Sequence, residues 1–140
     1  MKNRILTIGL FLLSTLFCLA QGPTNRTTKT IVADAIGQLP ASNQNDYNKI
    51  IEELISTGEE GVLQLVGMME PQGSTINSTL EYALSGITHF VGNNKDESTR
   101  LMISNAYQKA IDKTASIENK AFLVRQLELI GQDEAVQAVT

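Results

Sequence analysis

Pairs of adjacent acidic residues recur at a regular spacing in this sequence, and carboxylates are groups that bind calcium or a basic partner. Three pairs begin 37 residues apart: Glu59-Glu60, Asp96-Glu97 and Asp133-Glu134. None of them lies in an oxygen-rich loop of the EF-hand kind, so a calcium site is not predicted. Each pair follows an apolar segment and a glycine, and acids in the first turn of a helix stabilise it by about 0.3–1 kcal/mol each. We therefore interpret the pairs as the starts of three helices.

The other residues that could bind a metal or take part in catalysis lack the neighbouring residues that such sites need. His89 is the only histidine, and without a second His or a Cys it predicts neither a metal centre nor a catalytic triad. Met68 and Met69 are soft ligands for copper, but their apolar surroundings favour core packing. Asn25 and Asn77 begin glycosylation-type tripeptides and are interpreted as polar loop or cap residues. We predict no catalytic residue, no cofactor and no metal ligand in these residues.

The amino terminus has the composition of a secretory signal peptide. Lys2 and Arg4 precede an apolar run over residues 5–19, and the small Ala20 is followed by polar residues. This order predicts a signal peptide over residues 1–20 that is cleaved after Ala20. We therefore expect a periplasmic or secreted protein, with a flexible leader over residues 21–29.

Two other interpretations of this segment are less favourable. A membrane-spanning helix needs roughly 20 apolar residues, and a lipid attached to Cys18 is disfavoured by the bulky Phe17 beside the cut. Cys18 is the only cysteine, so the mature chain would contain no disulfide. Cleavage would leave nine basic and fifteen acidic residues and change the net charge from −4 to −6. We expect no nucleic-acid partner and, after cleavage, no membrane contact, because both need clustered basic residues.

The rest of the chain repeats a helical period, which predicts an all-α domain over residues 30–140. Aromatic residues make up only 5% of the chain and tryptophan is absent, so we expect an aliphatic core between helices. Gly58 and Gly131 are predicted to end helices. The apolar stripes cover residues 31–39, 47–55, 62–69, 76–91, 103–111 and 123–130, and a last one begins at 135. Because that last stripe has no cap, we expect the array to continue in a longer protein.

Several segments resemble HEAT repeats, which pair an aliphatic helix with a second helix after a short turn. Residues 119–139 (NKAFLVRQLELIGQDEAVQAV) carry the resemblance most fully, and residues 56–69 and 79–92 are similar to the same unit. Only Val124-Arg125 matches the usual Val-Arg dipeptide of the family. Residues 106–113 (AYQKAIDK) also resemble a tetratricopeptide helix, but the other positions of that repeat are missing. The HEAT resemblance implies an α-solenoid of antiparallel helix pairs.

The order of parts is also similar to that in a group of exported bacterial proteins. In that group a helix ending in LPA (residues 39–41) precedes a STGEEGV turn and an EYALSG helix. A HEAT array can there precede a concanavalin-like domain related to 3-keto-disaccharide hydrolases. Two functions are therefore expected: a non-catalytic scaffold for a protein or polysaccharide partner, or the non-catalytic arm of a carbohydrate-active hydrolase. In the second case catalysis would lie beyond residue 140.

Overall fold

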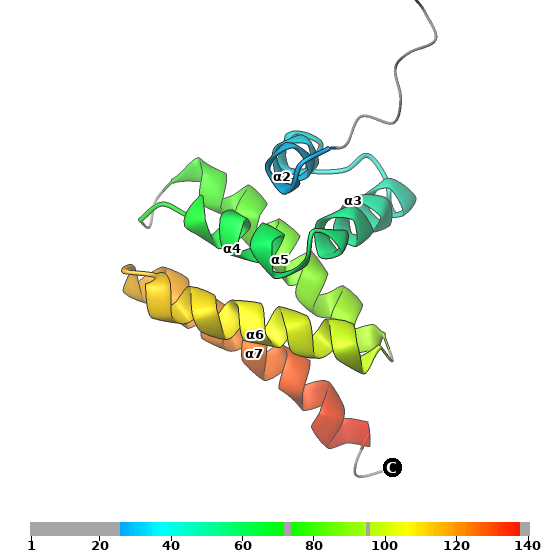
Figure 1. Ribbon diagram of the computed structural model, residues 1–140, viewed down its shortest axis with the longest axis vertical. Coiled ribbons are helices and arrows are strands. Elements are labelled where there is room, and N and C mark those ends of the chain that lie inside the picture. The colour runs from blue at the N-terminus through cyan, green and yellow to red at the C-terminus, as the bar shows by residue number, and fades with distance from the viewer. Residues whose placement is uncertain (1–25, 72–73, 95, 138–140) are drawn as a thin grey trace, which may run out of the picture.

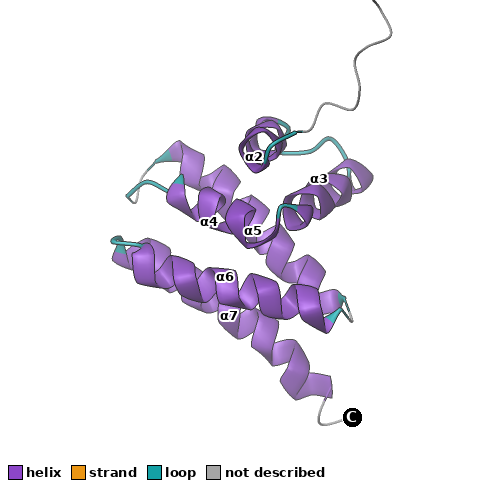
Figure 2. Cartoon of the chain, in the orientation of Figure 1, coloured by secondary structure: helices purple, strands orange, loops and turns teal. Residues whose placement is uncertain are grey.

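The computed structural model describes residues 26–71, 74–94 and 96–137. Within these ranges the chain forms six helices and no strand, so the all-α prediction is confirmed (Figure 2). The helices are α2 Thr28–Gly37, α3 Gln44–Ser56, α4 Gly58–Gly67, α5 Thr75–Asn93, α6 Glu97–Lys113 and α7 Ile117–Gln137. The predicted signal peptide and residues 21–25 of the predicted leader lie outside the described residues. The prediction of a flexible leader is wrong for its last residues, because α2 already begins at Thr28 and Arg26 pairs with Asp34 and Glu53.

Local side-chain chemistry explains where several helices begin and end. The side chains of Thr27, Asn43 and Asp96 each accept a hydrogen bond from a backbone N–H of the following turn. These N–H groups have no acceptor within the helix itself, so the side chains supply one. Helix α3 ends at Ser56, and Gly58 adopts a φ of 68° two residues later. That left-handed conformation costs glycine little, so the predicted glycine stop after α3 is confirmed.

The helices pack in an alternating order. Helix α4 packs on both α2 and α6, whereas α5 packs on both α3 and α7. Consecutive helices also contact each other, most extensively α6 and α7, which run in opposite directions in Figure 1. In that view α4 and α6 lie in front of α5 and α7. Every described helix therefore buries one face against helices from two or more other parts of the chain.

The core is aliphatic, as expected from the composition, apart from one buried tyrosine. Tyr107 of α6 is fully buried, and its Oη donates to the Leu84 carbonyl oxygen of α5 at 2.9 Å. Thr88 Oγ1 lies 3.0 Å from the same hydroxyl. Burial raises the pKa of Tyr107 far above the usual value of a tyrosine. The buried side chains include Val32, Ile51, Leu54, Val62, Leu65, Leu80, Leu84, Ile87, Val91, Ile103 and Leu123.

Helices α3 and α5 approach each other closely at Gly86. A Cβ atom at this position would lie 2.2 Å from Tyr47 Oη and 2.7 Å from Ile51 Cδ1. Tyr47 also packs its ring against Tyr82, with centroids 4.8 Å apart, and donates to the Tyr82 carbonyl oxygen. The absence of a side chain at Gly86 therefore sets the distance between the two helices.

The predicted break at Gly131 is wrong, because α7 runs without interruption from Ile117 to Gln137. Gly131 is exposed, and a Cβ there would meet nothing within 4 Å. A single glycine costs a helix only about 1 kcal/mol relative to alanine, and no proline or turn cluster follows it. Asp133-Glu134 consequently lies inside α7 and does not begin a helix. The predicted final helix from residue 135 is part of α7 up to Gln137, and the side chains from residue 132 onward lie outside the described part of the structure.

Candidate functional site

The first acidic pair joins three helices. Glu59 and Glu60 lie in the first turn of α4, as predicted. The Lys109 ammonium of α6 lies 2.7 Å from a Glu59 carboxylate oxygen, and Thr28 Oγ1 of α2 donates to Glu60 at 3.2 Å. These exposed contacts link α4 to both helices on which it packs, so the pair has a structural role.

The second acidic pair begins α6 as predicted. Asp96 is the N-cap residue, and its side chain also accepts hydrogen bonds from the Thr99 and Ser98 hydroxyls. These bonds lower the pKa of Asp96. Glu97 pairs with Arg100 one turn along the helix. All of these contacts stabilise the first turn of α6.

His89 and the two methionines also lie as the sequence predicts. His89 is exposed near the end of α5, where Asn93 Nδ2 donates to its carbonyl oxygen at 2.9 Å. Met68 and Met69 are partly buried against the core, although they follow α4 and do not lie within it. Among the described side chains, no group of three His, Cys, Asp or Glu residues is arranged to hold a metal ion. None of the described helices is long and apolar enough to cross a membrane.

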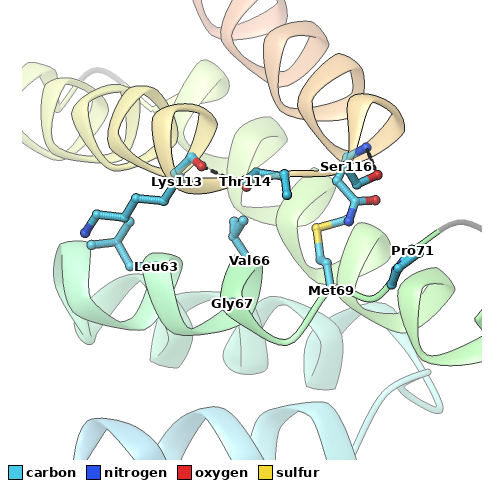
Figure 3. A pocket seen from close by; sticks show the side chains of 11 residues that line it. Leu63, Val66, Gly67, Met69, Pro71, Lys113, Thr114 and Ser116 are labelled. Atoms are coloured by element: carbon cyan, nitrogen blue, oxygen red, sulfur yellow. Dashed lines mark hydrogen bonds between the residues drawn. The ribbon is translucent and has the colours of Figure 1, made fainter.

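A groove of about 370 Å³ lies between the end of α4 and the segment that joins α6 to α7. We call it the Lys113 groove. Its apolar wall consists of Leu63, Val66, Met69, Pro71 and Ala110. Figure 3 shows the α4 side chains facing the α6–α7 segment across this space. The groove has the size and the largely apolar lining of a small ligand site, for which volumes of about 300–1,000 Å³ are usual.

The polar side of the groove carries one positive charge. Lys113 is exposed at the end of α6, and none of the described residues that line the groove with it is acidic. Figure 3 draws Lys113 and Leu63 at one end of the groove, and Met69, Pro71 and Ser116 toward the other. Because the chain as a whole carries a net charge of −4, this site differs in sign from the average surface and favours an anionic group.

Two buried asparagines fix the loop that forms the far wall. Asn77 Oδ1 accepts from the Glu70 backbone N–H at 2.9 Å, and Asn77 Nδ2 donates to the Glu70 carbonyl oxygen at 2.7 Å. Asn119 Nδ2 of α7 donates to the same carbonyl oxygen at 3.1 Å. We call these three residues the asparagine clamp. The interpretation of Asn77 as a polar loop or cap residue is wrong, because Asn77 is buried within α5 and bonds to a distant backbone group. Asn119 was not predicted, and Asn25 lies outside the described residues.

A second cavity, of about 650 Å³, adjoins the Lys113 groove at Asn119, which lines both. It lies between the starts of α5 and α7, and we call it the Glu81 cavity. Polar and charged residues line most of it: Ser74, Asn77, Glu81, Glu118 and Arg125, with Phe122 as the aromatic exception. The buried Asn119 is therefore part of the wall of both the apolar groove and the polar cavity.

The role of these surfaces is inferred from their residues, because the comparisons with known proteins found no match. No protein-family model matches the chain, no curated protein is significantly similar to it, and no solved structure matches it. The arrangement of the described residues is suited to binding: a preformed apolar groove, a single cation, and hydrogen-bonding groups held by buried contacts.

Proposed function

We propose that this chain is a non-catalytic, helical-repeat interaction scaffold of an exported protein. The observation that carries the proposal is the alternating packing, with α4 between α2 and α6, and α5 between α3 and α7. This order of contacts is the one expected of a HEAT-like α-solenoid, in which each helix pair buries its faces only against neighbouring pairs. Such arrays present extended surfaces to a partner and need no catalytic groups.

A protein partner is supported by apolar side chains that α7 leaves exposed. Ile117 is 78% exposed, Val124 42% and Leu129 46%. Single exposed apolar residues are common on protein surfaces, but three on one helix favour protein recognition.

Photo-crosslinking tests the proposal. Benzoylphenylalanine at Val124 of the full chain, expressed in its own cells, should give a discrete adduct with another protein. The same group at Lys49, an exposed residue of α3 whose side chain is 77% accessible, is the matched control. Adducts at neither position, or equally diffuse adducts at both, would contradict a scaffold that binds through α7.

Export is a second part of the proposal. It is supported by the order of basic, apolar and small residues up to Ala20. The intact mass of the protein from its own cells should correspond to a chain that begins at Gln21. A chain that retains Met1, or one that carries lipid on Cys18, would contradict cleavage after Ala20.

A further inference from the structure

We propose that the Lys113 groove and the Glu81 cavity together bind the carboxyl-terminal end of a partner protein in extended form. This inference rests on the proposed scaffold function and names the ligand chemistry. The last side chain of the partner is apolar and lies against α4, its terminal carboxylate lies at Lys113, and the preceding residues pass Asn119 into the Glu81 cavity.

The apolar wall selects the last side chain. Leu63, Val66 and Met69 line one side of the groove, and Pro71 and Ala110 extend the wall. At about 370 Å³ the groove is near the lower end of ligand-site volumes, so it accommodates one or two residues and not a folded element. Burial of an aliphatic side chain there contributes the hydrophobic part of the binding.

The single cation selects a carboxylate. Among the described residues that line the groove, Lys113 is the only charged one, and its end of the groove lies away from Ser116 and Pro71 (Figure 3). A chain terminus places a carboxylate directly beside the last side chain, so an ammonium and an apolar wall in one groove can contact both groups. An internal peptide segment offers a carboxylate there only where it carries an Asp or Glu side chain.

Asn119 fixes the direction of the bound chain. Its Nδ2 must face the Glu70 carbonyl oxygen, because only the amide nitrogen can donate. This orientation leaves Oδ1 as an acceptor, and no hydrogen bond among the described residues uses it. Asn119 is only 4% exposed and lies where the two cavities meet. A peptide N–H that passes this point can donate to Oδ1.

The Glu81 cavity sets the preference for upstream residues. Two carboxylates, those of Glu81 and Glu118, and one guanidinium, that of Arg125, line it. A hydrogen bond from its own backbone N–H, and one from Ser116 Oγ at 2.8 Å, lower the pKa of Glu118. The cavity therefore has the opposite sign from the groove and favours a basic residue a few positions before the carboxyl terminus.

The experiment is a fluorescence-anisotropy titration of the full chain with labelled heptapeptides. The peptides carry a lysine upstream and end in Leu, Val or Phe, each as the free acid and as the carboxyl-terminal amide. At least one free acid should bind ten or more times more tightly than its amide. Free acids that bind no better than their amides, or that do not bind, overturn the proposal. Octanoate serves as the other source of an apolar carboxylate, and competition by it at the same concentration as the peptide also overturns the proposal.

Matched variants test the location. Gly67 lines the groove, and Gly67→Leu adds a side chain at a position where a Cβ meets nothing within 4 Å; Gly37→Leu is its control at an equally open position on α2. Lys113→Gln removes the cation, and Lys49→Gln is its control. We expect at least a tenfold loss of affinity for the first member of each pair and less than a twofold change for the controls. Equal effects within the pairs would refute the site.

This outcome can be separated from failure of the scaffold itself. Val124 lines neither the groove nor the Glu81 cavity, so a crosslink there reports binding on α7 outside the peptide site. An adduct at Val124 without any peptide affinity would refute the groove proposal and leave the scaffold intact. Peptide affinity without an adduct would refute the α7 surface and leave the groove intact.

Discussion

The asparagine clamp offers a sharp test of how the groove is held in shape. Asn77 makes two hydrogen bonds to the Glu70 backbone and is only 7% exposed. A buried hydrogen bond contributes about 0.5–1.5 kcal/mol net, so Asn77→Ala should lower the free energy of unfolding by about 1–3 kcal/mol. Asn119→Ala removes one hydrogen bond, while the Glu70 carbonyl oxygen still accepts from Asn77. This variant should therefore lower the free energy of unfolding by about 0.5–1.5 kcal/mol.

The double variant provides the decisive comparison. With both asparagines absent, the Glu70 carbonyl oxygen loses both of its side-chain donors, a state that neither single variant produces. The double variant should therefore lose more than the sum of the single losses, by about 0.5–3 kcal/mol. Urea unfolding followed by far-UV circular dichroism measures all three, with exposed Asn48→Ala as the control. Strict additivity, or a loss for Asn77→Ala no larger than that for Asn48→Ala, would refute the clamp.

Three other substitutions or conditions test the packing. Leu84→Asp places an unpaired charge at a fully buried site and should lower the free energy of unfolding by several kcal/mol. Glu59→Gln removes an exposed ion pair worth about 1 kcal/mol at most. Similar melting temperatures for the two variants would show that the helix faces are wrong. Gly86→Ala should destabilise the fold by about 1–3 kcal/mol through overpacking. Gly37→Ala, at an open position, should stabilise the fold slightly. A shift of the same sign in both melting temperatures would contradict the close approach of α3 and α5. Because burial raises the pKa of Tyr107, the folded state favours the neutral hydroxyl and should lose stability as the pH rises above 10.0, the usual pKa of a tyrosine. Tyr107→Phe should remove that part of the loss of stability at alkaline pH. An unchanged dependence of stability on pH in this variant would refute the prediction.

Helix content was predictable because it depends on local periodicity. The stripe over residues 47–55 and Gly58 predicted both the course and the end of α3, and the structure confirms them. Gly131 shows the limit of the same argument. Glycine marks a stop only where the chain adopts a left-handed turn, and a single glycine in a chain that stays helical costs too little to break a helix.

The groove was not predictable because its walls come from distant segments. Asn119 bonds to a backbone group 49 residues earlier, a contact that no local pattern indicates. Lys113 belongs to the end of an amphipathic helix, where a basic residue is expected for purely local reasons. Only the packing of α4 against α6 brings Lys113 beside the apolar residues at the end of α4.

Native mass spectrometry of the full chain, purified under mild conditions from its own cells, most directly tests whether the protein works by binding another protein. A scaffold predicts a complex of defined mass in which one copy of a second protein accompanies each copy of this chain. The complex should dissociate in a variant that carries charges at two exposed α7 positions, Ile117→Asp and Val124→Asp, while the variant keeps its helical circular dichroism. A chain found only as its own monomer or homo-oligomer, or a complex that survives both substitutions unchanged, would contradict binding through α7.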